Sequence, residues 1–328
     1  MKNNSLVIIA GPCSVDEHNQ KELYEIADIE VTSRAGARQR AIAGARVVGL
    51  KSRTALNATG EGMGIDYAAF RENRERFMSG GSVDDFALPP SVEIARQLVE
   101  DTGMMAASEV MDPMLQLAPY EGRVGQGKLF LWNPAVNQLG WQVACMAEYA
   151  RRNGWNIGLK NPKWVGEALA SANARLFTGQ TTMEKTWAGL ASFARGLENE
   201  PVLIHRGVDV AEKGRYRSVP VHEIARRVKL QTGCKLYFDP SHSYGPKMRE
   251  EIVPAVIEAM KMKIADDQYL YDGILVEAGT SQTDTEQHIT LQELGEMVTA
   301  LARFRDLVEP AREKSPSLAA TQKVRARA

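Results

Sequence analysis

The feature that most constrains the fold of this chain is a repeated alternation of short apolar runs with longer segments of helical periodicity. Segments such as 91–103 and 219–233 repeat apolar residues at the spacing of one helix face. Strands that alternate with helices predict βα units and a parallel sheet. The apolar runs, each ending in polar or glycine-containing sequence, span residues 6–14, 45–54, 104–112, 128–134, 155–162, 201–207, 235–242 and 272–279.

Eight such units in 328 residues indicate one architecture above others. A (β/α)8 barrel typically takes about 250 residues. We therefore expect an α/β protein with a single (β/α)8 TIM barrel domain over residues 1–310. A doubly wound open sheet is the alternative, but no GxGxxG motif follows a strand, and eight units are many for one open sheet. Two segments fall outside the pattern: a glycine-rich connection, expected to be a long loop 55–90, and a basic flexible tail over 311–328.

Composition excludes several classes of protein. The formal net charge is −1, so no global field attracts nucleic acid or a membrane surface. Three cysteines without CxxC spacing argue for a reducing compartment and against a disulfide framework. No segment approaches the about 20 consecutive apolar residues of a membrane span. We expect a cytoplasmic protein with neither nucleic acid nor membrane as a partner.

Charged side chains stand at the ends of the predicted strands. In barrels of this kind, catalytic groups project from the C-terminal ends of the strands. Taken singly, a strand-end lysine or arginine is more often a solvated loop charge. Clustered at one face, they would bind phosphate or carboxylate groups. The cations are Arg46, Lys51, Arg53, Lys160 and Arg206, and the nearby carboxylates are Glu109 and Asp239.

A second set of strand-end residues has the character of metal ligands. Cys13, His242, Glu277 and Asp284 offer a thiol, an imidazole and two carboxylates from distant parts of the chain. Such a mixed set suits a divalent transition metal such as Mn²⁺, Fe²⁺, Co²⁺ or Zn²⁺. The alternative for Cys13 is a small buried hydrophobe, and for His242 a hydrogen-bonded structural residue. The convergence of four donors at one predicted face favours the metal site.

Seven motifs occur in the order seen in one enzyme superfamily. They are AGPCS (10–14), RVVGLKSRT (46–54), SEVMDP (108–113), GLKNP (158–162), HRGV (205–208), FDPSHS (238–243), and VEAG with TDTEQ (276–279, 283–287). The chain thus resembles type I 3-deoxy-D-arabino-heptulosonate 7-phosphate (DAHP) synthases and the related 3-deoxy-octulosonate 8-phosphate synthases. The resemblance implies a (β/α)8 barrel that condenses phosphoenolpyruvate with an aldose phosphate and releases phosphate. It also implies a homo-oligomer, dimer or tetramer, and a place in aromatic amino acid biosynthesis, the shikimate pathway.

The resemblance assigns roles to individual residues. Cys13, His242, Glu277 and Asp284 would hold the metal. Lys160, Arg206 and Arg46 match positions that bind phosphoenolpyruvate, with Glu109 nearby. Lys51 would lie beside both substrates, and Arg53 with Thr54 would receive the aldose phosphate. Asp239 would support the metal site or position its water, so the catalytic group comprises Lys51, His242, Cys13 and Asp239.

One departure keeps other functions open. After the fourth strand the family has G-A-R-N or G-A-R-T, whose arginine grips phosphate, whereas this chain has Trp132, Asn133 and Pro134. Lys163 or Lys185 could replace that contact. The first hypothesis is therefore a DAHP synthase-like enzyme, and the second is a divergent relative with a different donor or acceptor in specialised metabolism. The third is a non-catalytic barrel that binds an anionic metabolite or a partner protein.

Overall fold

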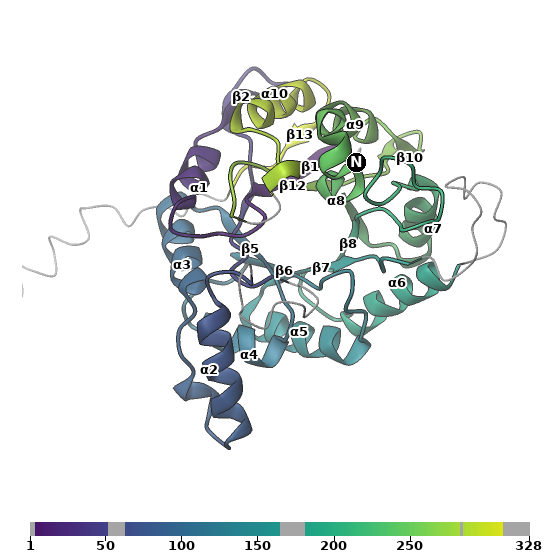
Figure 1. The fold of residues 1–328 in the computed structure, drawn as a ribbon. Coiled ribbons are helices and arrows are strands. Elements are labelled where there is room, and N and C mark those ends of the chain that lie inside the picture. Colours follow the sequence, from purple (N-terminus) through teal and green to yellow (C-terminus); the bar gives the residue numbers. More distant parts are fainter. Residues whose placement is uncertain (1–3, 52–62, 165–180, 283–284, 311–328) are drawn as a thin grey trace, which may run out of the picture.

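Eight parallel strands close into a barrel. The structure, a computed structural model, describes residues 4–51, 63–164, 181–282 and 285–310. Each strand pairs with the next, and the last pairs with the first, which closes the ring seen in Figure 1. The predicted (β/α)8 barrel is confirmed, and the open sheet is excluded. The barrel strands, in order, are β1 (Ser5–Gly11), β4 (Gly44–Arg46), β5 (Met105–Glu109), β6 (Leu129–Trp132), β7 (Asn156–Lys160), β8 (Val202–His205), β9 (Lys235–Phe238) and β12 (Gly273–Glu277).

Helices form the outer ring around these strands (Figure 1). Several carry sequence-encoded ends: Thr181 and Thr290 begin helices with capping boxes, and left-handed glycines such as Gly154 end them. No helix in the described ranges has the length and apolar character needed to cross a bilayer. The helices are α1 (Gln20–Ala27), α2 (Tyr67–Met78), α3 (Pro90–Thr102), α4 (Pro113–Leu117), α5 (Gly140–Asn153), α6 (Thr182–Phe193), α7 (His222–Thr232), α8 (Pro240–Tyr244), α9 (Ile252–Ala259) and α10 (Leu291–Ala302).

Short elements decorate the barrel. A hairpin of β2 (Glu30–Thr32) and β3 (Arg38–Arg40) follows α1, and β10 (Lys263–Ala265) pairs with β11 (Gln268–Tyr269) after α9. β13 (Asp306–Leu307) adds to the edge of β1 near its start. The 3-10 helices are η1 (Val83–Asp85), η2 (Ala118–Tyr120), η4 (Pro246–Glu251) and η5 (Thr285–Gln287).

The strands bury two separate faces. Leu129 and Leu131 of β6 point outward into the large core under the helices, whereas Phe130 and Trp132 belong to the smaller core inside the barrel. This alternation is the period of two that a β-strand imposes. Phe130 stacks on Tyr237 of β9 at 5.9 Å between ring centroids. The barrel interior is therefore filled by side chains, and the polar groups above Trp132 rest on an apolar floor.

Two sequence-based boundaries differ from the structure. The second strand ends at Arg46, whereas the apolar run predicted a strand up to residue 54. The segment 55–90, expected to be a long loop, contains helix α2 in its described part. The apolar periodicity of α2 is weak, and pairs such as Arg76 with Glu72, one helical turn apart, support its exposed face. Because charge pairs within α2 stabilise its exposed face, the sequence of this helix shows little apolar periodicity.

Candidate functional site

The C-terminal ends of the barrel strands meet at one end of the barrel, which we call the mouth. β4, β5, β6, β7 and β12 each end in a large side chain, and further polar residues follow β1, β4, β8 and β9 directly. Most of these side chains are fully or almost fully buried. Together they form what we call the mouth cluster: Cys13, Arg46, Lys51, Glu109, Trp132, Lys160, Arg206, Asp239, His242, Glu277 and His288.

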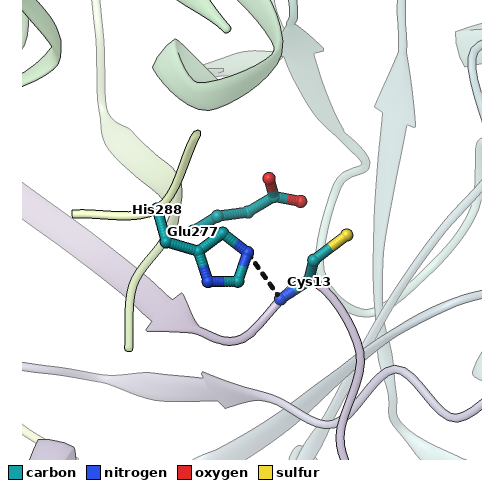
Figure 2. Close-up of side chains that lie close together, drawn as sticks. All are labelled: Cys13, Glu277 and His288. Atoms are coloured by element: carbon teal, nitrogen blue, oxygen red, sulfur yellow. Dashed lines mark hydrogen bonds between the residues drawn. The ribbon is translucent and has the colours of Figure 1, made fainter. Parts of the chain in front are cut away.

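Three atoms able to bind a metal come together within this cluster. The Sγ of Cys13, a carboxylate oxygen of Glu277 and a ring nitrogen of His288 all lie within 4.8 Å of one another (Figure 2). The adjacent ends of β1 and β12 position two of them, since Gly11 pairs with Glu277 and Cys13 follows two residues later. All three residues are buried. A thiolate, an imidazole and a carboxylate fit a divalent transition metal.

His288 presents the correct nitrogen for such a metal. Its Nδ1 lies 2.9 Å from the carbonyl oxygen of Gly279, so Nδ1 carries the proton and donates it. Nε2 is then a lone-pair acceptor, and it receives the backbone N–H of Cys13 at 3.3 Å. Burial lowers the pKa of His288 and favours the neutral imidazole that metals bind. A carbonyl that fixes the tautomer of a histidine ligand is a common feature of metal sites.

The sequence did not identify His288 as a ligand. It lies on the connection after β12, four residues beyond Asp284, without a strand-end position of its own. Asp284 lies outside the described residues, as do Arg53 and Thr54. Protonated His242 lowers the pKa of Glu277, but His242 is not part of the three-residue donor group. Its role as a metal ligand stays a prediction.

Glu277 is held in place from two sides. Arg46 Nη2 donates to Oε1 at 2.9 Å, and Gln287 Nε2 donates to Oε2. Arg217 Nη1 in turn donates to the amide oxygen of Gln287. Burial alone would raise the pKa of Glu277, but His242 in its protonated form and the Arg46 guanidinium hold that pKa well below its usual range. The carboxylate is therefore ionised and fixed, which a metal ligand requires.

Lys51 lies directly against the cysteine. Its Nζ is 2.8 Å from Cys13 Sγ and 3.3 Å from the Cys13 carbonyl oxygen. Burial, and then the negative charge of Glu277, raise the pKa of the Cys13 thiol to about 11. Burial would lower the pKa of Lys51, but the neighbouring acidic groups outweigh it and raise that pKa. A divalent cation would favour the thiolate form of Cys13, because a coordinating thiol loses its proton.

The opposite side of the mouth pairs a lysine with two carboxylates. Lys160 Nζ lies 3.1 Å from Asp239 Oδ2 and 4.0 Å from Glu109 Oε1. His242 Nδ1 lies 3.0 Å from Asp239, which also accepts the backbone N–H of His242. Burial would raise the pKa of Asp239, yet His242 and Lys160 hold it well below its usual value. Burial lowers the pKa of His242 to about 4, so its imidazole is neutral at pH 7.

Two buried guanidinium groups have N–H donors without an acceptor in the part of the chain that the structure describes. Arg206 Nε and Nη1 and Arg46 Nη1 are buried and lack a hydrogen-bond acceptor among the described residues. Burial lowers the pKa of Arg206 to about 10, so it stays charged at neutral pH. Leaving charged donors buried and unsatisfied costs more than about 1–3 kcal/mol each. An anionic ligand would supply the missing acceptors.

The charges of the mouth do not cancel. Within the described part of the cluster, four cationic side chains face three carboxylates, which leaves an excess of one positive charge. A metal ion would raise this excess by two, and two anionic substrates would lower it. The cations are Arg46, Lys51, Lys160 and Arg206, and the carboxylates are Glu109, Asp239 and Glu277.

Trp132 stands where the resembling family has an arginine-containing turn. Its indole is fully buried at the end of β6. The Arg46 guanidinium carbon lies 5.3 Å and Lys160 Nζ 5.6 Å from its ring centroid. The two lysines considered as replacements lie elsewhere: Lys163 pairs with Asp209 at 3.6 Å, and Lys185 is exposed on α6. Neither has a contact with the mouth cluster among the described interactions.

Comparison with known proteins supports the fold. No family model matches the chain, and no curated protein sequence does. Among solved structures, a DAHP synthase (phospho-2-dehydro-3-deoxyheptonate aldolase) from Thermotoga maritima superposes with a TM-score of 0.64 at 16% identity, covering 93% of this chain and 72% of that one. A truncated DAHP synthase from the same organism gives 0.59 at 17% identity, covering 93% and 90%. At this identity the likeness establishes that the chain has the barrel fold of DAHP synthases.

Proposed function

We propose that this protein is a divergent, metal-dependent member of the DAHP synthase superfamily. It would condense phosphoenolpyruvate with an aldose phosphate and release inorganic phosphate. The shared barrel and the ordered motifs support this proposal. The observation that carries it is the combination at one mouth of the Cys13, Glu277 and His288 donor group with buried guanidinium donors that have no acceptor.

The cations would hold two anionic substrates face to face. The unused N–H groups of Arg46 and Arg206 would bind the carboxylate and phosphate of phosphoenolpyruvate, and Lys160 would support them. Lys51, between the donor group and Glu109, would lie beside both substrates. Bringing two anions together is costly unless cations surround them, and fixed charges in a dry site stabilise them strongly.

The reaction balances with water as the third reactant. The enol carbon of phosphoenolpyruvate forms a bond to the aldehyde carbon, and the aldehyde oxygen takes a proton. Water adds to the resulting cationic carbon and replaces the proton taken by the aldehyde oxygen. The new hydroxyl then loses its proton as the carbon–oxygen bond to phosphate breaks, which leaves a ketone and inorganic phosphate. A divalent metal held by Cys13, Glu277 and His288 would supply Lewis-acid activation of the aldehyde or water. His242, neutral and bonded to Asp239, could accept or return a proton at its other nitrogen.

A second candidate function has its own observation. Trp132 places an aromatic surface, rather than a cation, beside Arg46 and Lys160. A divergent relative that uses a donor other than phosphoenolpyruvate would need less positive charge at this position.

The first experiment measures phosphate release from phosphoenolpyruvate by the purified Mn²⁺-loaded chain. The aldoses are erythrose 4-phosphate, arabinose 5-phosphate and unphosphorylated erythrose, each with and without EDTA. We expect EDTA-sensitive release with one phosphorylated aldose. No release with any aldose would contradict the proposed reaction, and aldose-dependent consumption of pyruvate, in a parallel arm that offers pyruvate in place of phosphoenolpyruvate, would favour the second candidate.

A pair of histidine variants tests the metal site within the same assay. We expect His288→Ala to lose stoichiometric metal, measured by elemental analysis after dialysis. His18→Ala, at an exposed position, is the control, and we expect it to keep its metal. Full metal content in His288→Ala would contradict the assignment of His288 as a ligand.

A further inference from the structure

Trp132 has a hydrogen-bond donor with no partner. Its Nε1 is buried and has no acceptor within the described part of the chain, although the side chain is fully shielded from solvent. Buried indole N–H groups usually find a partner, because an unsatisfied donor costs about 1–3 kcal/mol. The surroundings of Trp132 must therefore explain why its N–H has no acceptor among the described residues.

The other buried tryptophans differ from Trp132 in their surroundings. Trp187 Nε1 donates to the Leu159 carbonyl at 2.8 Å. Trp155 also lacks an acceptor, but it precedes β7 at the opposite end of the barrel and packs edge-to-face against Tyr120. Trp132 alone among these three ends a barrel strand and contacts cations of the mouth.

The Trp132 ring lies beside two cations of the mouth, one of which has an unused donor. Arg46 Nη1 has no acceptor, and the Arg46 guanidinium lies over the Trp132 ring at 5.3 Å. Lys160 Nζ approaches the same ring at 5.6 Å and pairs with Asp239, whose charge also acts on Arg206. The electron-rich indole face stabilises cations placed over it. Trp132 thus holds two cations in place and adds a neutral N–H donor to theirs.

We propose that Trp132 is a substrate-contacting and specificity-determining residue. Its indole N–H donates a hydrogen bond to an anionic oxygen of the donor substrate, together with Arg46 Nη1 and the two unused N–H groups of Arg206. This inference rests on the proposed function. Because the indole N–H is directional but uncharged, it discriminates between donor substrates by the position of their oxygen atoms. The oxygen belongs to either the carboxylate or the phosphate of the donor substrate.

Indole NMR resonances test this contact directly. The chain contains five tryptophans, so a ¹⁵N-labelled sample gives five indole N–H signals. The signal missing in Trp132→Phe assigns Trp132, and the Trp155 signal is an internal control. We expect phosphoenolpyruvate to move the Trp132 proton downfield, as hydrogen-bond formation does, and to leave Trp155 in place. Pyruvate and inorganic phosphate are added separately, and whichever reproduces the shift identifies the carboxylate or the phosphate as the acceptor.

Calorimetric titration of the same three ligands completes the test. We expect Trp132→Phe to weaken phosphoenolpyruvate binding about 10-fold, since a tenfold change corresponds to the loss of one good hydrogen bond. Because Phe also removes ring area, a second variant carries 3-benzothienylalanine at position 132, in which sulfur replaces the N–H and little else changes. It should show the same loss, whereas Trp155→Phe should bind like wild type.

The outcomes separate this inference from the proposed function. If phosphoenolpyruvate binds but the Trp132 signal stays in place, or if the benzothienylalanine variant binds normally, the inference is wrong and the proposed function stands. If none of the three ligands binds the wild-type protein, both are wrong. If pyruvate or phosphate binds with the Trp132 shift but phosphoenolpyruvate is not turned over, the contact is correct and the reaction is not.

Discussion

Two groups of buried titratable side chains in the described part of the chain contrast in how they handle charge. The mouth cluster gathers charged groups at the strand ends. A second group, which we call the wall cluster, consists of His205, His222 and Tyr271 and lies among aromatic side chains such as Phe238. His205 ends β8 but belongs to the outward face of the strand, between the sheet and the helices. The two groups share burial but differ in charge.

The wall cluster forms two hydrogen bonds within itself and leaves one neutral ring nitrogen without a partner among the described residues. The Tyr271 hydroxyl lies 2.8 Å from His205 Nδ1 and 2.7 Å from His222 Nδ1, so one imidazole donates to it and the other accepts. His205 Nε2 is buried without a partner, which costs least if that nitrogen carries a lone pair. His205 then donates to Tyr271, and Tyr271 donates to His222. Burial lowers the pKa of both imidazoles, that of His222 to about 4, so the cluster is neutral at pH 7.

This difference distinguishes buried polar groups that serve a function from those that stabilise the fold. The wall cluster needs no ligand, because its hydrogen bonds join side chains of the protein to one another. The mouth cluster instead leaves charged donors of Arg46 and Arg206 unsatisfied and an excess of positive charge. Burying unsatisfied charge is unfavourable unless a ligand completes the site. We therefore expect changes in the mouth to affect activity and changes in the wall to affect stability.

The largest expected effect is that of Cys13→Ala on activity. The variant removes the thiol from the three-residue donor group, so we expect at least a roughly 1,000-fold loss of kcat in the phosphate-release assay, together with loss of bound metal. Cys145→Ala is the matched control, because Cys145 lies on α5 and is only partly buried. Comparable metal content and activity in Cys13→Ala and Cys145→Ala would remove the basis for a metal-dependent mouth.

A smaller effect, on stability alone, is expected from Tyr271→Phe. Removing the hydroxyl leaves both wall imidazoles without their shared partner, and we expect the free energy of unfolding to fall by about 2 kcal/mol. Urea denaturation at pH 7.5 measures this loss, and kcat should stay within about twofold of wild type. Tyr67→Phe is the control, since the Tyr67 hydroxyl has no hydrogen bond within the described chain. A large drop in kcat with unchanged stability would reverse the contrast between the two clusters.

The parts of this arrangement that sequence could predict follow from local rules. Alternating apolar runs and helical segments predicted all eight barrel strands, and the rule that active groups lie at strand ends predicted the convergence of Glu109, Lys160 and Glu277 at one mouth. These residues are one step from a regular element, so their position in space follows from the register of the sheet.

The parts that sequence could not predict depend on tertiary contacts. His288 reaches the donor group only because the chain after β12 folds back, where its Nδ1 meets the Gly279 carbonyl. Trp132 was noted as the loss of an arginine, but its stacking against Arg46 and Lys160 depends on three different strands. The wall cluster joins residues from β8, from α7 and from just before β12, which no spacing rule relates.

The smallest expected effect is a change in how stability depends on pH, measured with His222→Asn. In wild type, the pKa of His222 is about 4 when folded and about 6.5 when unfolded. Between these values the unfolded chain binds more protons, so the free energy of unfolding falls as pH falls, by about 1 kcal/mol per pH unit for this histidine.

Asn at position 222 keeps an acceptor for the Tyr271 hydroxyl but cannot titrate. Urea denaturation at pH 7, 6 and 5 should therefore give a shallower slope in the variant. His242 and His288 titrate in both proteins and cancel in the difference. The variant also removes the repulsion by which His222 lowers the pKa of His205, which makes the slope shallower in the same direction. His18→Asn, at an exposed position, is the control variant. Parallel slopes for His222→Asn and wild type would mean that folding leaves the pKa of His222 at its unfolded value, so burial would not keep the wall imidazole neutral below about pH 6.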